Sequence, residues 1–166
     1  MTATPISMHL MEKISLSKTG FVIQLHIAAM FLTSLVTGNL INRFGHSKIM
    51  HMGVLLFLVT IITSLFEQNF INYMIALIFL GLGWNFLFIG GTTLVTESYT
   101  PSEKAKTQGL NDFMIFGTVA LTAGISGVVH EIAGWQMLNL LVLPFLALVL
   151  LLIIWFSRVR QTEGVI

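Results

Sequence analysis

Charged side chains are scarce in this sequence: they make up 9% of its 166 residues, whereas hydrophobic residues make up 55%. A soluble globular domain is about a quarter charged, because water must solvate its surface. Eight basic and seven acidic residues cannot solvate the surface of a chain of this length. The composition therefore excludes an ordinary soluble domain and predicts that lipid covers most of the surface.

Cysteine is absent, which excludes disulfides and thiolate metal sites. The net charge of +1 is too small to indicate a nucleic-acid partner, because phosphates are bound by clusters of Lys and Arg. The sequence also lacks a nucleophile–base pair, a zinc-protease motif and a phosphate-binding glycine loop. We therefore expect no enzyme, no cofactor and no metal site.

Long apolar segments are what the sequence does contain. A helix needs about 20 apolar residues to cross the hydrocarbon core of a bilayer. Five segments approach or exceed that length, and short connections with turn-forming or charged residues join them. They are residues 19–41, 49–66, 71–97, 107–130 and 135–156. We therefore predict an all-α membrane protein with five transmembrane helices.

Lys and Arg occur in the connections after the first and third segments and after the last one. They are missing from the other two connections, which carry Glu67 and Glu131. Because cytoplasmic loops retain Lys and Arg, this side is predicted to be cytoplasmic, with the C-terminus inside. The predicted organisation is an extracytoplasmic segment at 1–18, a five-helix bundle at 19–156 and a cytoplasmic tail at 157–166. The six basic residues are Arg43, Lys48, Lys104, Lys106, Arg158 and Arg160.

Polar side chains form aligned stripes on the first, third and fourth segments, whereas the second and fifth are almost wholly apolar. Polar groups at membrane depth are costly unless they face a partner helix or water. Two interpretations stay open: the stripes line a shared cavity, or they hydrogen-bond helices to each other. The residues that would line a cavity are His26, Thr33, Asn85, Thr92, Asn111, Thr118 and Thr122.

Two side chains within these segments can change charge. His26 is a candidate for proton coupling, because histidine titrates near neutral pH, and its alternative role is that of a hydrogen-bonded interior residue. Asp112 is the other candidate, and its alternative role is to stabilise the positive N-terminal end of its helix. Glu97 is expected to pair with Lys104 or Lys106. His46, His51 and His130 lie near the predicted interfaces and are assigned no role.

The connection after the first segment reads Gly38-Asn-Leu-Ile-Asn42-Arg43-Phe-Gly45-His-Ser-Lys48. It resembles the loop signature G-x-x-x-D-R-x-G-[RK]-[RK] of the major facilitator superfamily, although Asn42 replaces the acidic residue and Ser47 replaces a basic one. Residues 81–113 are similar to the tenth and eleventh helices of bacterial permeases in this family, and residues 1–9 to the end of their seventh. The resemblance implies that the five segments are the eighth to twelfth helices of a twelve-helix transporter.

This resemblance implies a function and a partner. Family members alternate access between two six-helix halves around a central site. The chain would then be most of the C-terminal half of a permease in the bacterial inner membrane, with the N-terminal half as a missing partner. Its ligand would be a small solute, with a proton as a candidate co-substrate. A membrane accessory bundle without transport activity is the alternative, and a membrane-embedded enzyme using His26 and Asp112 is the least favoured.

The charge pattern gives a prediction about topology. Single cysteines introduced at positions 46 and 103 of this cysteine-free chain should face the cytoplasm, and those at 67 and 131 the outside. A membrane-impermeant thiol reagent added to intact cells should therefore label only the second pair. Labelling at position 46 or 103 from outside would refute the orientation.

Overall fold

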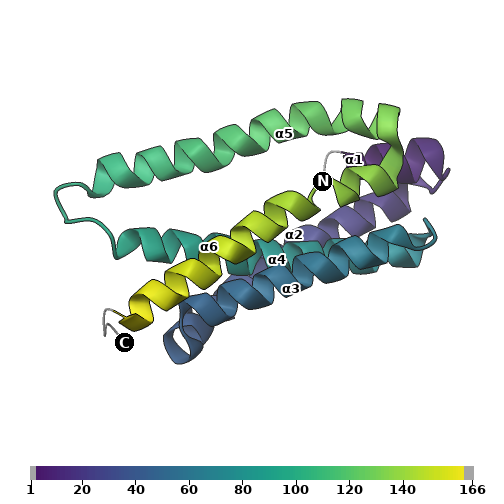
Figure 1. The fold of residues 1–166 in the computed structure, drawn as a ribbon. Coiled ribbons are helices and arrows are strands. Elements are labelled where there is room, and N and C mark those ends of the chain that lie inside the picture. The colour runs from purple at the N-terminus through teal and green to yellow at the C-terminus, as the bar shows by residue number, and fades with distance from the viewer. Residues whose placement is uncertain (1–2, 163–166) are drawn as a thin grey trace.

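The structure is a computed structural model that describes residues 3–162 as a set of helices joined by short turns (Figure 1). Long apolar sequences fold this way in lipid because a helix satisfies all of its backbone hydrogen bonds internally. The described elements are α1 (Ala3–Pro5), the π-helix η1 (Ile6–Met11), α2 (Leu16–Phe44), α3 (His46–Leu65), α4 (Phe70–Thr96), α5 (Lys104–Leu140) and α6 (Leu143–Thr162). Of the predicted cytoplasmic tail, residues 157–162 continue α6 and the rest lies outside the described residues.

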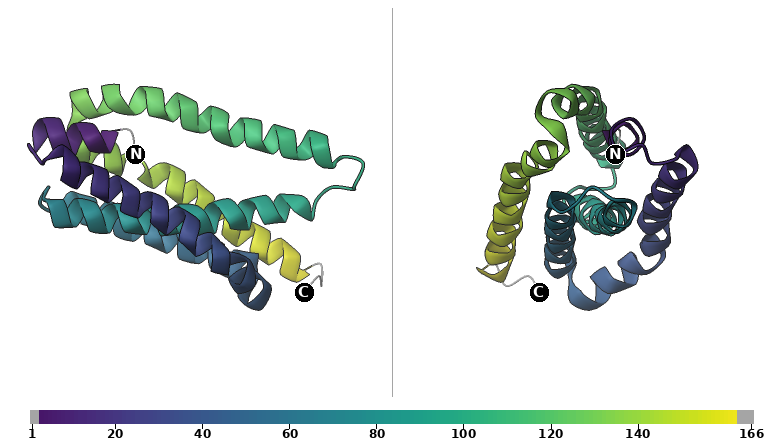
Figure 2. Two further views of the ribbon diagram at one scale, coloured as in Figure 1. Left: turned by 180° about the vertical axis from the view of Figure 1, so that it is seen from behind. Right: turned by 90° about the vertical axis from the view of Figure 1, so that its right-hand side faces the viewer.

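Four helical stretches in the described part of the chain are long and apolar enough to cross a membrane, and the last of them runs over 57 residues from Lys104 to Arg160. A continuous helix of that length would be about 85 Å long, far more than one crossing needs. The chain instead bends at Gly134, where φ is 77°, and α6 runs back beside the bundle (Figures 1 and 2). This arrangement gives two crossings and agrees with the five predicted segments.

A helical stretch does begin at the predicted residue 135, directly after the bend at Gly134, but the predicted fifth helix is interrupted a few residues later. Residues 135–140 still belong to α5 beyond its bend, and the chain leaves the helix at Leu141 and Val142 before α6 begins at Leu143. Pro144 explains the interruption, because proline has no N–H to donate to the carbonyl four residues earlier. The break lies in an apolar stretch, residues 140–143, so hydropathy alone did not reveal it.

The α2–α3 connection is much tighter than the predicted seven-residue loop. Only Gly45 separates the two helices, and its N–H donates to the carbonyl of Ile41 at 2.7 Å. The backbone at Gly45 has φ 85° and ψ 156°, a conformation essentially confined to glycine. The glycine of the loop signature is therefore the residue that reverses the chain.

The α4–α5 turn is held by a local hydrogen-bonded motif. The hydroxyl of Thr100 donates to the Glu103 carboxylate at 2.7 Å, and the Thr100 N–H donates to the same oxygen at 3.1 Å. These bonds lower the pKa of Glu103, with the hydroxyl bond the larger cause. The charged carboxylate therefore stays at the start of α5, where the helix dipole favours a negative charge.

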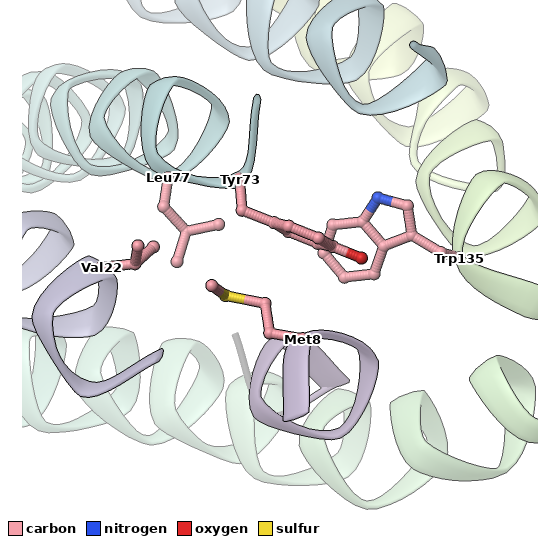
Figure 3. Packing of buried hydrophobic residues seen from close by; sticks show 5 residues of the cluster. All are labelled: Met8, Val22, Tyr73, Leu77 and Trp135. Carbon is pink, nitrogen blue, oxygen red and sulfur yellow. The ribbon is translucent and has the colours of Figure 1, made fainter. Parts of the chain in front are cut away.

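Helix α4 is the centre of the bundle. It packs against α2 on one side and α3 on the other, and α6 lies against α3 through an apolar cluster of Val54, Ile61, Leu146 and Ile153. Helix α5 stands apart from the others over most of its length and meets them mainly near its bend (Figure 2). There Met8, Val22, Tyr73, Leu77 and Trp135 form a cluster that joins η1, α2, α4 and α5 (Figure 3).

The α2–α4 contact depends on Gly81. A Cβ atom at this position would lie 2.7 Å from the carbonyl oxygen of His26 and 3.1 Å from the Cβ of Ala29. We predict that Gly81→Ala lowers the free energy of unfolding by about 1–3 kcal/mol. The two opposing atoms are a backbone oxygen and a Cβ atom of α2, which cannot move aside unless the helix itself shifts.

Gly91 of the same helix provides the matched control, because a Cβ there would have no neighbour within 4 Å. Thermal unfolding of the chain in detergent should show a large loss for Gly81→Ala and little change for Gly91→Ala. Equal losses would mean that crowding against α2 does not set the effect, because intrinsic helix propensity favours Ala over Gly at both positions.

Candidate functional site

Two of the predicted polar stripes meet where α2 packs on α4. The buried His26 places Nδ1 2.8 Å from the carbonyl oxygen of Leu77. Because a carbonyl only accepts hydrogen bonds, Nδ1 carries the hydrogen and donates it. The Asn85 amide nitrogen donates to the carbonyl of Met30 at 2.8 Å, and the Thr37 hydroxyl donates to the Asn85 amide oxygen at 2.5 Å. These bonds connect α2 to α4 over more than two turns of each helix.

This geometry favours a packing role for part of the predicted cavity lining. His26 and Asn85 are 4% and 5% exposed, and Nδ1 of His26 and both polar atoms of the Asn85 amide are used in the α2–α4 contact. Thr33 and Thr92 donate to carbonyls of their own helices, those of Ala29 and Phe88. None of these four predicted residues borders the groove described next.

A groove of about 450 Å³ lies between α4 and α5. Three of the predicted residues, Asn111, Thr118 and Thr122, border it from α5, together with Met114, Ile115 and Val119. Trp84 borders it from α4. Positions 111, 115, 118 and 122 follow the helical spacing of one face, which is why the sequence predicted them as a single stripe.

The chemistry of the groove suits an uncharged ligand. None of its lining residues is ionisable. The hydroxyls of Thr118 and Thr122 donate to the carbonyls of Met114 and Thr118, which leaves their oxygen lone pairs as acceptors. The Trp84 ring is stacked on Phe88 with centroids 6.0 Å apart and an interplanar angle of 15°. The groove thus combines a supported aromatic wall with amide and hydroxyl groups.

Asp112 is not one of the groove residues. It is exposed on α5, and its Oδ1 accepts a hydrogen bond from the Asn111 amide at 3.3 Å. Within residues 3–162, no group of three His, Asp or Glu side chains is arranged to hold a metal ion.

The prediction for Glu97 is wrong. Its partners are Arg160 of α6, which donates to Oε2, and His46 of α3, whose Nε2 lies 3.6 Å from Oε1. The sequence favoured Lys104 and Lys106 because they are near in the chain, and it contained no signal for a residue 63 positions away.

The other residues of the loop signature lie in the last two turns of α2 and the first turn of α3. Gly38, Asn42, Arg43 and Lys48 are exposed, and the Arg43 guanidinium stacks on the Phe44 ring at 5.2 Å. Sequence analysis also assigned no role to His130, which is wholly buried. The burial of His130 could not be predicted from its position near the end of a predicted helix.

The α2–α4 hydrogen bonds lead to a prediction about stability. Asn85→Ala should lower the free energy of unfolding by about 0.6–1.7 kcal/mol, the range for interhelical hydrogen bonds in membranes. Asn111→Ala should change it little, because Asn111 reaches only its exposed neighbour Asp112. Unfolding of both variants in detergent tests this difference, and a larger loss for Asn111→Ala would contradict the assignment of Asn85 to the helix contact.

Comparison with known proteins identifies the family. The riboflavin transporter RfnT of Brucella anthropi is 45% identical over 150 residues, which are 90% of this chain and 37% of the relative. Two uncharacterized transporters of Bacillus subtilis, YdeG and YddS, are 39% and 34% identical over 96% and 99% of the chain. The chain therefore spans less than two-fifths of these relatives, 37% of YdeG and 38% of YddS. No solved structure matches significantly. The family model of the Major Facilitator Superfamily matches residues 1–165, and the chain belongs to this superfamily of multi-pass membrane proteins.

Proposed function

We propose that this chain is the C-terminal part of a larger permease that moves a small solute across the bacterial inner membrane by alternating access. The groove between α4 and α5 is the observation that carries the proposal, because an uncharged polar stripe and an aromatic side chain border it within helical stretches that are long and apolar enough to cross a membrane. Polar groups in this setting mark a ligand path when no partner helix covers them. The match to only 37–38% of each of the three relatives supports a larger protein that supplies the opposite wall.

The proposed orientation follows the basic residues. Gly45, the Thr100–Glu103 turn and the end of α6 lie at one end of the bundle (Figure 1), which is the end where Lys and Arg gather. We assign this end to the cytoplasm by the positive-inside rule. The bend at Gly134 and the turn at Glu67 then face outside.

The groove favours a neutral, flat heteroaromatic solute. A volume of about 450 Å³ is within the usual range for small-molecule sites. Trp84 offers a face for ring stacking, and Asn111 offers both a donor and an acceptor to the edge of a heterocycle. Riboflavin has this chemistry, and it is the solute named for the relative that is 45% identical. We therefore propose riboflavin or a similar flavin as the substrate.

Proton coupling remains part of this proposal. Asp112 is the better candidate of the two, because its carboxylate is exposed. His26 is less suited, since it is buried between α2 and α4 and only 4% exposed.

A chimera tests the function. The N-terminal portion of RfnT, joined to this chain in place of its own matching C-terminal segment, should take up riboflavin in cells that depend on external riboflavin. In this chimera Trp84→Ala and Asn111→Ala should each lower uptake about two- to tenfold at unchanged membrane levels, as expected for losing one stacking or hydrogen-bonding contact.

The matched controls are Trp155→Ala on α6 and Asn39→Ala on α2, both exposed and absent from the groove lining. They should leave uptake unchanged. Equal effects of the groove and control variants would reject the groove as the solute path, and a chimera that reaches the membrane without any uptake would argue against flavin as the substrate.

A further inference from the structure

His130 is the buried polar residue that the proposed function leaves unexplained. Its side chain is 0% exposed, and neither ring nitrogen has a hydrogen-bond partner among the described residues. Buried polar groups are almost always hydrogen-bonded, so an unpartnered one calls for a specific explanation. A buried imidazole without hydrogen bonds destabilises the folded state, so the role of His130 must be something other than stability.

The surroundings of His130 link it to the segment that precedes α2. Its ring lies edge-on to Trp135 with centroids 6.0 Å apart, and Trp135 in turn meets the edge of Tyr73 at 5.1 Å. The Tyr73 hydroxyl is hydrogen-bonded to the Ser7 hydroxyl at 2.6 Å. Met8 packs into the same cluster, as Figure 3 shows. The contact therefore joins α1 and η1 to the ends of α4 and α5.

The segment over this contact has unusual backbone geometry. Residues Ile6–Met11 form a π-helix, a conformation that is rare and frequently found at functional sites. Lys13, just after it, has φ 54°, in the left-handed region that non-glycine residues seldom adopt. Both features make the closed position of this segment locally costly, so that its packing on Tyr73 and Trp135 must hold it in place.

Protonation of His130 would act on this packing through Trp135, which the ring contacts. The neutral imidazole is tolerated in the apolar contact, where it lacks only hydrogen bonds. The imidazolium has two N–H donors and a positive charge, and a buried charge without an acceptor is far more costly than a neutral polar group. The free energy of the imidazolium therefore falls when the contact opens and water reaches the ring.

We propose that His130 is a proton-binding site, and that protonation there releases α1 and η1 from the ends of α4 and α5. The ligand is a proton, and the moving part is the helical segment Ala3–Met11. If this end faces outside, as proposed above, acid outside the cell opens the outer end of the bundle. The release itself depends neither on the solute nor on the orientation.

Other titratable groups lie on the elements around this contact. They are His9, Glu12 and Lys13 at or just after η1, Lys18 on α2, Glu67 at the α3–α4 turn, Tyr73 on α4 and Glu131 on α5. None of them forms an ion pair with His130 within the described residues. His9 places Nδ1 2.9 Å from the carbonyl oxygen of Ile14, so its own protonation retains an acceptor that His130 lacks. His9 is therefore the matched control.

The first experiment measures proton binding. Replacing Trp84 and Trp155 with Phe leaves Trp135 as the only tryptophan of the chain, with the His130 ring 6.0 Å from it. The fluorescence of this chain in detergent, followed from about pH 8 to about pH 4, should change in one step, because protonation of His130 opens the contact around Trp135. The step should persist in His9→Gln and disappear in His130→Gln.

The second experiment measures opening. A cysteine at the buried position Thr4 should react with a maleimide several-fold faster at the acid end of this range, relative to a cysteine at the exposed position Met11. The ratio corrects for the pH dependence of thiol reactivity. His130→Gln should abolish the increase, and His9→Gln should retain it.

Several outcomes would overturn the proposal: no pH step in the parent chain, a step that survives His130→Gln, or a step that disappears in His9→Gln. His130→Leu is the second variant, because replacing an unsatisfied buried polar group with an apolar one of similar size should be neutral or stabilising. Failure of both His130 variants to fold would show that the imidazole makes an essential bond, which also refutes the proposal. Neither readout involves transport, so these outcomes are independent of the proposed function.

Discussion

The close contact between α2 and α4 is the interaction on which the other features of the structure depend. Lipid offers no hydrophobic driving force between two apolar helices, so their association needs close packing and interhelical hydrogen bonds. Gly81 allows the α4 backbone to approach the carbonyl of His26, and at that distance His26 and Asn85 reach backbone carbonyls on the opposite helix. The same few residues thus provide both the close packing of the two helices and the hydrogen bonds of their buried polar groups.

The α2–α4 contact also determines which surface of α4 is available to a ligand. Asn85 is directed into α2, and the adjacent Trp84 borders the groove against α5. Helix α3 covers another side of α4, and α6 covers α3. The groove therefore lies on the remaining side, where α5 stands away from the bundle and presents Asn111, Thr118 and Thr122.

The two ends of the bundle are joined in different ways. At the end that carries the basic residues, Glu97 connects α4 to α3 and α6 through partly exposed polar contacts with His46 and Arg160. At the opposite end, η1, α4 and α5 meet through aromatic and apolar contacts around Tyr73 and Trp135. The first kind of contact is weakened by water and salt, and the second by a buried charge.

The sequence by itself determined the class of the protein, its apolar segments and the polar face of α5. These features depend on local composition and helical spacing, since an apolar segment must form a helix in lipid and residues four apart share a face. Family membership was also predictable, because the signature around Gly45 is a contiguous stretch of sequence that the family match confirms.

Only the tertiary structure decided which polar residues face a groove and which face another helix. The sequence placed His26, Asn85 and Asn111 in one class, although the first two bond across the α2–α4 contact and the third borders the groove. It also missed the pairing of Glu97 with Arg160 and the burial of His130. Such assignments depend on how helices distant in the chain are rotated and spaced relative to one another. That arrangement is a compromise among many contacts, and no short segment of sequence contains it.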